Sequence, residues 1–321
     1  MRNIAIIAWG DSSEYEVSLK SAQNICNALS WVRGYRIFLI VCRWKDWVYE
    51  ADDWTKIKVD KNDLSLAIQS EKIFLEYAYI TIHWTPWENW EIQWYFDILW
   101  IPYSTWGVLN TSTWFDKFFS KMIVQTHGIN TPKWICINKW NEIEESIIIS
   151  ELWLPLFVKT NEWWSSFWIT KVKEGDSLRF AINKAFKECD NVIIEEAINW
   201  REFTCWLYKS KWRINVFPIT EIITNKEFFD YDAKYLWNSK EVTPADIPDD
   251  LRKLIEESSI KVYEKLNCNW IVRIDYIYDW EKLYFLEVNL TPWMTEASLV
   301  PQQIKACWLT LTEVLMDIIE K

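Results

Sequence analysis

The sequence is poor in glycine, with 5 glycines among 321 residues, and it carries 26 tryptophans. At the average usage of about 7%, a chain of this length would hold roughly 20 glycines. Glycine adopts left-handed backbone conformations without steric cost and lets the backbone approach a ligand closely. As written, the sequence therefore excludes an ordinary glycine-rich phosphate loop, and the abundance of tryptophan needs an explanation of its own.

Paired cysteines, long apolar runs and a positive charge balance are also missing. The seven cysteines form no CxxC pair, which indicates buried thiols in a reducing compartment rather than a disulfide framework or a zinc site. No apolar run approaches the length of a membrane span. The first residues, MRNIAIIAWGDSSE, predict a first strand rather than a signal peptide. The net charge of −11 argues against nucleic acid or an anionic membrane as the main partner. We expect a soluble, cytoplasmic protein that acts on small molecules.

The chain is long enough for two or three domains. Over the first hundred or so residues, predicted strands near 4–8, 36–42 and 77–82 alternate with helical patterns such as 16–29. This alternation predicts a parallel α/β sheet. Later blocks repeat strands and helices without a Gly/Ser-rich or Pro-rich linker between them. We therefore expect the domains to pack closely around a shared cleft.

Several tryptophans stand where the backbone conformation carries the information. Trp100 follows the helical stretch EIQWYFDIL and precedes Ile-Pro, the place of the left-handed residue that ends a helix. Trp9 opens the turn after the first strand, where the backbone usually makes a close approach. Trp163, Trp164 and Trp168 lie in KTNEWWSSFWITKV, a loop between two predicted strands that otherwise resembles a phosphate cradle.

These positions predict that most of the tryptophans are glycines encoded by UGA, in a lineage that reads this codon as glycine. The alternative is a Trp-rich protein whose indoles pack in a core or line a binding platform. Trp47 and Trp54 lie in a polar region without obvious turn logic and are candidates for genuine tryptophans.

Three oxygen-bearing side chains lie on two neighbouring predicted strands. Asp275 is in RID, and Glu287 and Asn289 in LEVN point to the same face because strand side chains alternate. Such ligands suit magnesium, a hard cation that also binds phosphates. The alternative is a solvated hairpin, but these carboxylates are surrounded by Ile, Val, Leu and Phe, where unpaired charge is costly. The sequence therefore predicts a metal site here.

Two lysines are candidates for nucleotide phosphates. Lys159 ends the apolar strand LPLFVK just before the loop with Ser165 and Ser166, and Lys117 lies in a predicted basic helix. Either lysine alone would be read as surface charge. The combination of lysine and loop favours phosphate binding.

Six motifs, taken in order and with glycine in place of tryptophan, resemble those of the D-alanine–D-alanine ligases of the ATP-grasp superfamily over nearly the whole chain. They are GGDSSEYEVSL, HGTPGENGEIQG, KTNEGGSSFGITKV, DYDAKYL, RID and LEVNLTPGMTEASLVP. The resemblance implies an α+β, three-domain ATP-grasp fold with an N-terminal Rossmann-like parallel sheet. The implied domains are a D-alanine-binding domain at 1–108, a central ATP-grasp domain at 109–198 and a C-terminal catalytic domain at 199–321.

The resemblance also implies roles for individual residues. Glu14 would hold the ammonium of the first D-alanine in a network with Ser165 and Tyr235, and His83 would lie near its carboxylate. The residues implied for ATP are Lys117, Lys159, Trp164, Ser166, Glu195, Ile198 and Glu202, of which the last three would form the hinge for adenine and ribose.

Further roles concern the reacting groups. Lys234, on a loop that closes over the site in this family, would reach the transferred phosphate. Arg273 and the backbone N–H of Trp293 would steady the acyl phosphate and the oxyanion. Ser298 and Leu299 would receive the carboxylate of the second D-alanine. Two Mg²⁺ or Mn²⁺ ions would be bound by Asp275, Glu287 and Asn289.

The implied reaction is the ATP-dependent ligation of two D-alanines through a D-alanyl phosphate, for peptidoglycan precursors, by an enzyme that is commonly a homodimer. Related ligases with D-serine or D-lactate as second substrate are alternatives, although Lys234 and Tyr235 stand where D-lactate enzymes usually carry histidine. Thr160 replaces the proline that is common in the family. A non-catalytic Trp-rich binding protein is the alternative if the tryptophans are genuine.

Overall fold

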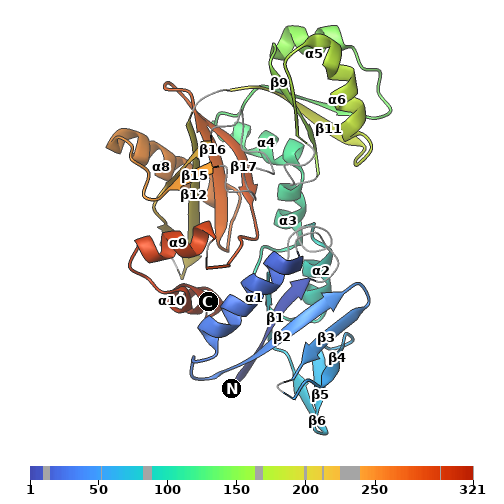
Figure 1. Cartoon of the computed structure of the whole chain (residues 1–321), viewed down its shortest axis with the longest axis vertical. Coiled ribbons are helices and arrows are strands. Elements are labelled where there is room, and N and C mark those ends of the chain that lie inside the picture. Colours follow the sequence, from blue (N-terminus) through green and yellow to red (C-terminus); the bar gives the residue numbers. More distant parts are fainter. Residues whose placement is uncertain are drawn as a thin grey trace.

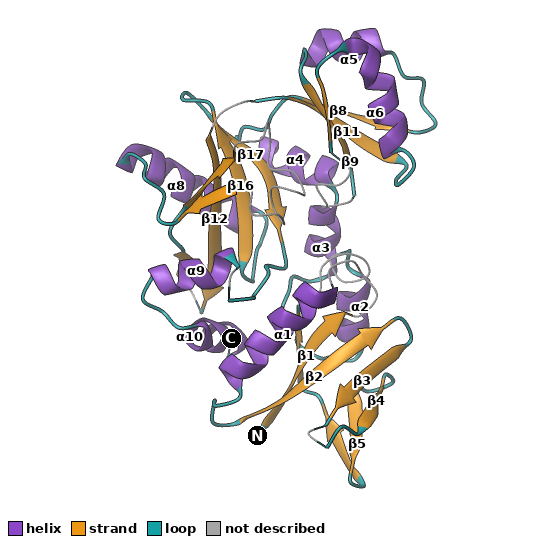
Figure 2. Ribbon diagram, viewed as in Figure 1, coloured by secondary structure: helices purple, strands orange, loops and turns teal. Residues whose placement is uncertain are grey.

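The computed structural model describes residues 1–9, 15–51, 53–81, 89–162, 169–198, 201–211, 213–224, 239–296 and 298–320. This part of the chain forms three β-sheets with helices packed against them (Figure 1). The sheet built from β8 to β11 lies at one end of the molecule and the N-terminal sheet at the other, as Figure 2 shows. The fold is a mixed α+β fold.

The N-terminal sheet has the order β6-β5-β4-β3-β2-β1-β7. Its strands are β1 (Arg2–Trp9), β2 (Tyr35–Arg43), β3 (Asp46–Glu50), β4 (Lys56–Asp60), β5 (Ser65–Ile68), β6 (Glu71–Phe74) and β7 (Tyr77–Ile80). β1 pairs in parallel with β2 and β7, whereas β2 to β6 pair antiparallel. The predicted parallel sheet is therefore confirmed for β1, β2 and β7, whereas β3 to β6 extend it with antiparallel pairings that the sequence did not predict. Short connections join these strands, and a parallel pairing would need a crossover of a dozen or more residues.

Strand β1 is buried on both faces. Ile4 and Ile6 face one apolar cluster together with helix α1 (Tyr15–Leu29), while Ala5 and Ile7 face a second cluster. This alternation follows from the two-residue period of a strand. The predicted strands and the predicted helix in this region are confirmed to within two residues at each end.

The second sheet has the order β10-β9-β11-β8, and all its pairings are antiparallel. Its strands are β8 (Trp134–Asn138), β9 (Leu156–Thr160), β10 (Thr170–Val172) and β11 (Asn191–Glu196). Helices α5 (Glu145–Leu152) and α6 (Leu178–Ala185) bury apolar side chains against it. Helices α2 (Glu91–Ile98), α3 (Val108–Phe115) and α4 (Lys117–Thr126) lie along the chain between the first two sheets.

The third sheet has the path β15-β14-β12-β16-β17, with β13 also paired to β12. Its strands are β12 (Arg201–Ser210), β13 (Arg213–Val216), β14 (Thr220–Thr224), β15 (Ser239–Val242), β16 (Val272–Tyr278) and β17 (Leu283–Asn289). The sequence over 215–220 is expected to form one strand, and this expectation is wrong because residues 217–219 separate β13 from β14. The sequence also leads us to expect a helix over 251–266, which is confirmed as α8 (Asp249–Lys265), and the predicted strand pair of Asp275 and Glu287 is confirmed as β16 and β17.

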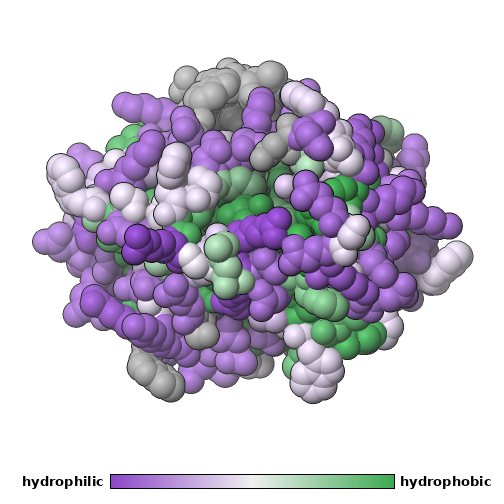
Figure 3. Space-filling model, turned by 90° about the horizontal axis from the view of Figure 1, so that it is seen from below, coloured by the Kyte–Doolittle hydropathy of each residue, from purple (hydrophilic) through white to green (hydrophobic). Residues whose placement is uncertain are grey.

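The chain ends in α9 (Leu299–Ala306) and α10 (Leu311–Ile319), and these helices pack against the N-terminal segment. Arg2 donates a hydrogen bond to the backbone oxygen of Ile319 at 3.0 Å, and Asn24 donates one to the backbone oxygen of Met294 at 2.6 Å. The first and last parts of the chain therefore share one apolar core, as the absence of linkers predicts. No helix in the described part of the chain has the length and apolar character needed to cross a membrane. Figure 3 shows hydrophilic residues over much of one end face, with hydrophobic residues gathered near its centre.

Positive φ angles are concentrated at tryptophan. Among the described residues, twelve non-glycine residues have positive φ, and seven of them are Trp44, Trp54, Trp90, Trp100, Trp153, Trp280 and Trp308. All seven side chains are exposed, from 41% for Trp90 to 96% for Trp308. Left-handed backbone of this kind costs an L-residue roughly 1–2 kcal/mol. The molecule thus places its largest side chain where glycine is the favoured residue.

Three sequence-based statements about individual tryptophans can be compared with this pattern. Trp100 has φ 56° directly after the helix C-cap, so the predicted left-handed end of the helix is confirmed. The interpretation that Trp54 does not occupy a turn position is wrong, because Trp54 has φ 67° and its N–H donates to the backbone oxygen of Ala51 within a turn. Trp9 still belongs to β1, paired with Cys42, rather than to the following turn. Trp47, in contrast, lies on β3, is buried and packs edge-on against Tyr95.

Candidate active site

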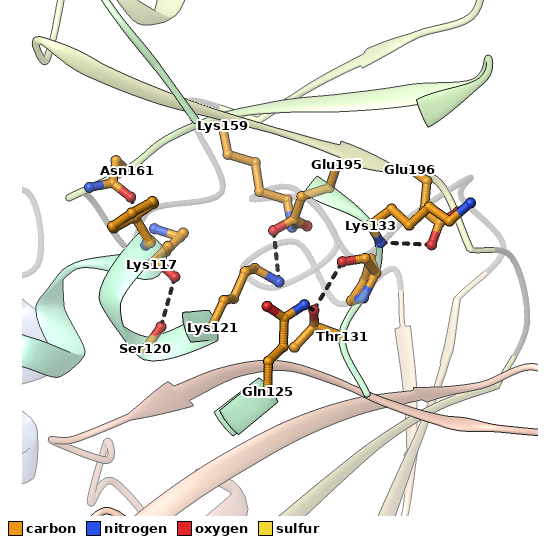
Figure 4. A network of polar contacts seen from close by, with 12 residues as sticks. Lys117, Ser120, Lys121, Gln125, Thr131, Lys133, Lys159, Asn161, Glu195 and Glu196 are labelled. Atoms are coloured by element: carbon orange, nitrogen blue, oxygen red, sulfur yellow. Dashed lines mark hydrogen bonds and ion pairs between the residues drawn. The ribbon is translucent and has the colours of Figure 1, made fainter. Parts of the chain in front are cut away.

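A buried carboxylate bridges two lysines between α4 and the second sheet (Figure 4). Glu195 on β11 is 2% exposed, and its two oxygens lie 2.9 Å from Lys121 Nζ and 2.7 Å from Lys159 Nζ. Burial would raise the pKa of Glu195, but the two lysines lower it to about 2. Burial likewise acts to lower the pKa of Lys159, and Glu195 more than offsets this and raises it. The glutamate is therefore ionised, and it fixes both ammonium groups.

A third lysine lies in the same neighbourhood. Lys117 is the first residue of α4 and is 5% exposed. Burial lowers its pKa to about 8, although Glu287 acts in the opposite direction and Lys159 in the same one. Three ammonium groups thus share an environment with two carboxylates, those of Glu195 and Glu287. Several ammonium groups gathered in one place favour the binding of an anion with several negative charges, such as a polyphosphate.

The second group of charged residues lies on β16 and β17. Asp275 stands directly opposite Glu287 in the register of the two strands, and Arg273 stands opposite Asn289. Asn289 Nδ2 and Arg273 Nε each donate to Asp275 Oδ2 at 3.0 Å. Asp275 Oδ1 is buried and receives no aligned hydrogen bond in the described part of the molecule, although Arg273 Nε is 2.9 Å away. A register irregularity follows Asp275, and bulges of this kind are common beside active sites.

The two groups belong to one electrostatic site. The negative charge of Glu287 acts to raise the pKa of Lys117, Lys159 and Arg273, although burial outweighs this effect at Lys117. The charge of Glu202 acts in the same direction on Lys159 and Arg273. The second and third sheets therefore bring their charged ends together. The structure unites most of the predicted phosphate, ribose and metal residues that it describes, namely Lys117, Lys159, Glu195, Glu202, Arg273, Asp275, Glu287 and Asn289.

Other predicted residues lie at the start of α9. Ser298 is the N-cap of this helix, Leu299 is its first residue, and the Ser298 hydroxyl shares a 2.6 Å hydrogen bond with Thr295. A helix N-terminus offers free backbone N–H groups to a carboxylate. Trp293 is half-buried on the segment that leads to this helix, and Ile198 is half-buried just after β11. The predicted residues outside the described part of the chain are Glu14, His83, Trp164, Ser165, Ser166, Lys234 and Tyr235.

Sequence reasoning missed two residues at this site. Lys121 lies four residues after Lys117 on one helix, so the i, i+4 rule could have placed both on the same face. Asn161 comes two residues after Lys159 and is 1% exposed, yet nothing local in the sequence distinguishes it from an ordinary loop asparagine. Among the described residues, no group of three or more His, Cys, Asp or Glu side chains is arranged to bind a metal. The candidate metal site therefore needs the side-chain oxygen of Asn289 as a third ligand, in addition to the carboxylates of Asp275 and Glu287.

Comparison with known proteins gives matches along the whole chain. Residues 123–320 match the family described as the D-ala D-ala ligase C-terminus. The D-alanine--D-alanine ligase of Bacteroides fragilis is 40% identical over 320 residues, covering 99% of this chain and 98% of the relative. The enzyme of the same name from Phocaeicola vulgatus is 42% identical over 320 residues, with the same coverage.

Solved structures agree with the sequence relatives. The VanG D-Ala:D-Ser ligase from Enterococcus faecalis superposes with a TM-score of 0.87 and 28% identity, covering 99% of this chain and 98% of the other. The D-alanine--D-alanine ligase from Bacillus anthracis complexed with ATP superposes with a TM-score of 0.80 and 26% identity, covering 100% and 97%.

Proposed function

The chain belongs to the D-alanine–D-alanine ligase family, and from this premise we propose how its side chains join two D-alanines with the consumption of ATP. It is an ATP-dependent ligase of the ATP-grasp fold that forms D-alanyl-D-alanine for the cell wall. The observation that carries the assignment of the site is the convergence of Lys117 and Lys159 with the opposed carboxylates of Asp275 and Glu287.

ATP would bind with its phosphates at Lys117 and Lys159. The gathering of lysine ammonium groups in this buried cluster supports that orientation. Both oxygens of Glu195 face lysines, so we assign its side chain to fixing Lys159 rather than to the nucleotide. The hinge contact to adenine then falls to Ile198, just after β11, and the ribose contact to Glu202 at the start of β12.

Asp275, Glu287 and Asn289 would hold Mg²⁺ or Mn²⁺, as two ions. Two carboxylates directly opposite on neighbouring strands repel each other, and a bound divalent cation would offset that repulsion. The buried Oδ1 of Asp275, which receives no aligned hydrogen bond in the described part of the molecule, supports its use as a ligand. When bound, the metal would neutralise the charge that gathers on the transferred phosphoryl group.

The reaction needs two steps because a carboxylate is a poor electrophile. In the first step the D-alanine carboxylate takes the γ-phosphoryl group of ATP and gives D-alanyl phosphate and ADP. In the second, the amine of the other D-alanine attacks the acyl carbon and inorganic phosphate leaves. Arg273, held in place by its contacts with Asp275, would stabilise the negative charge of the acyl phosphate and of the tetrahedral intermediate, together with the N–H at Trp293.

The substrates would be positioned from both ends of the chain. Ser298 and Leu299, at the start of α9, would receive the carboxylate of the second D-alanine. For the first D-alanine we retain the assignments made from the sequence, to Glu14 with Ser165 and Tyr235, and to His83. Lys234 would reach the transferred phosphate, and Trp164 and Ser166 would line the phosphate loop. These residues lie outside the described part of the structure.

We further propose that most of the tryptophans are glycines in the natural protein, with UGA as their codon. Seven exposed tryptophans with left-handed backbone support this assignment. The indole N–H groups of Trp106 and Trp206 add support, since they are buried without a hydrogen-bond partner in the described part of the molecule. From the sequence motifs alone, glycine would also replace Trp163, Trp164 and Trp168 in the phosphate loop and Trp293 beside the oxyanion. An intact-mass measurement of the natural protein tests this, and a mass equal to that of the written sequence contradicts it.

The activity is tested in the chain that carries Trp163→Gly, Trp164→Gly, Trp168→Gly and Trp293→Gly. It should release phosphate from ATP only when D-alanine is present, and competition with D-serine and D-lactate should leave D-alanyl-D-alanine as the main product. Arg273→Ala should abolish the reaction. Normal dipeptide synthesis by that variant would overturn the assignment of Arg273.

The remaining proposals concern organisation. We propose domains at 1–108, 109–198 and 199–321, and a homodimer that acts in the cytoplasm without nucleic acid or membrane as partner. The net charge of −11 supports the last point. Light scattering of the purified chain tests the dimer.

A further inference from the structure

Asn161 joins the end of strand β9 to the first turn of helix α4. Its side-chain oxygen accepts a hydrogen bond from the backbone N–H of Phe118 at 2.9 Å, and its amide donates to Asp116 Oδ2 at 2.8 Å. Its backbone oxygen accepts from the N–H of Lys117 at 3.1 Å. Asn161 is 1% exposed, and Figure 4 shows it beside Lys117. One residue therefore binds the N-cap of α4 and the first two residues of this helix, and 45 positions of sequence separate Asp116 from Asn161.

Both partners of this contact are themselves fixed. Asp116 is the N-cap of α4, and its Oδ1 accepts from the N–H of Phe119 at 2.9 Å. The N–H of Asn161 donates to the backbone oxygen of Asn191 at 3.0 Å, at the start of the strand that carries Glu195. The contact thus ties the helix of Lys117 to the two strands that carry Lys159 and its counter-ion.

We propose that Asp116 and Asn161 form a latch that positions Lys117 relative to Lys159, so that the two ammonium groups fit one polyphosphate. This inference rests on the proposed binding of ATP phosphates by these lysines. The two lysines come from different elements, and their backbones are linked most directly through the latch. Asp116 and Asn161 are positioning residues, because neither is required to touch the nucleotide.

The latch can be tested with a double variant that keeps the net charge of the parent and is compared with one of its single variants. Asn161→Asp keeps the acceptor for Phe118 but replaces the amide donor with a carboxylate facing Asp116, so the two side chains repel. Adding Asp116→Asn restores a donor and an acceptor at the same place with the polarity reversed. The amide at position 116 still caps the helix through its oxygen and now donates to the carboxylate at position 161. The double variant therefore retains every hydrogen bond and the net charge of the parent.

The experiment uses the full-length chain with the four glycine substitutions at the phosphate loop and oxyanion as parent. ADP binding is measured by calorimetry, and the KM values for ATP and D-alanine by steady-state kinetics. Asn161→Asp should weaken ADP binding and raise the KM for ATP by roughly tenfold or more, since misplacing a binding group by about 1 Å can cost a hundredfold. The KM for the second D-alanine should change by less than about twofold, because its proposed site lies at the start of α9. The double variant should recover ADP affinity to within about threefold of the parent.

Asn138→Asp is a matched control. Asn138 also accepts from a backbone N–H and donates to a side-chain oxygen in the same sheet, but it contacts Trp140 and Asn191 rather than α4. It should leave nucleotide affinity unchanged. If Asn161→Asp does not fold, Asn161→Ala removes the amide without adding charge and should show the same selective loss of ADP affinity.

Three results separate the inference from the proposed function. A folded double variant that stays as weak as Asn161→Asp overturns the latch and leaves the ligase assignment intact. A parent that binds ADP but forms no dipeptide overturns the proposed function, and the ADP titrations still decide on the latch. A parent that binds no nucleotide overturns both.

Discussion

Asp275 and Glu287 stand opposite each other on the antiparallel strands β16 and β17, with Asn289 donating to the same Asp275 carboxylate that Arg273 contacts. Like charges placed directly opposite each other in a sheet destabilise it. Arg273 balances one of these carboxylates, and the lysines near Glu287 balance part of the other. The pair is therefore tolerated in the free protein and suited to a divalent cation.

We expect Mg²⁺ to stabilise the folded protein through this pair. At a free concentration of a hundred times its dissociation constant, a ligand that binds only the folded state adds about 2.7 kcal/mol to the free energy of unfolding. Glu287→Gln should remove this Mg²⁺-dependent gain and the activity together, while Glu281→Gln, on the exposed turn before β17, should leave both unchanged. Thermal unfolding with and without Mg²⁺ measures the gain, and an equal gain in Glu287→Gln would contradict the site.

Lys117 should give ATP binding an alkaline limit. Its pKa in the free protein is about 8, lowered from 10.5 by burial. Below pH 8 the ammonium is present and attracts phosphate, and as the pH rises through 8 the proton is lost and kcat/KM for ATP should fall, approaching tenfold per pH unit. The effect on folding has the opposite sign. The folded state binds fewer protons than the unfolded state between pH 8 and 10.5, so Lys117 increases stability as the pH rises there.

The pH profile of kcat/KM for ATP tests this assignment, with Lys117→Arg as the control. Arginine stays charged over this range. In the variant, kcat/KM for ATP should therefore no longer fall as the pH rises through 8, although any decrease caused by the substrate amines should remain. A variant profile identical to that of the parent would assign the decrease to another group.

Lys121 should matter more for stability than its absence from the sequence-based site suggests. Its side chain is 1% exposed and that of its partner Glu195 is 2% exposed. Removing one partner of a buried ion pair leaves an uncompensated charge and costs about 3–5 kcal/mol. Because Lys159 still contacts Glu195, we expect Lys121→Met to cost about 3 kcal/mol, at the low end of this range.

Urea unfolding measures this loss, and a double-mutant cycle separates the ion pair from packing. Glu195→Gln added to Lys121→Met should cost less than the sum of the two single substitutions, because the double variant leaves no unpaired carboxylate. Additive losses would show that the lysine contributes through its methylene groups alone.

The sequence predicted well those elements that local periodicity determines. The apolar runs of β1 and β16 and the helical spacing of α1 were identified, because burial on one or both faces leaves a direct pattern in the chain. The strands β3 to β6 were not identified. Each has four or five residues with few fully buried positions, so their alternation is too short to be distinguished from loop sequence.

The same limit applies to the site. Lys159 and Asp275 could be proposed because charged side chains at the end of, or within, apolar strands need a partner. The positions of Lys121 and Asn161 depend on how α4 approaches β9, and 29 residues separate these elements along the chain. Their roles arise only from tertiary packing. The left-handed end of α2 at Trp100 was predictable because helix termination is a local property.

Two tryptophan substitutions should change stability in opposite directions. Trp100 is 92% exposed with φ 56°, so its indole contributes little packing while its backbone is strained. Trp100→Gly should therefore increase the free energy of unfolding by about 1 kcal/mol, the strain relieved minus the extra chain entropy of glycine. Trp47 is 7% exposed on β3 against Tyr95, and Trp47→Gly should lower the free energy of unfolding by about 3–5 kcal/mol. Denaturant midpoints at unchanged slope measure both effects. Destabilisation by Trp100→Gly would mean that the indole has a packing role, and it would weaken the assignment of glycine to the left-handed positions.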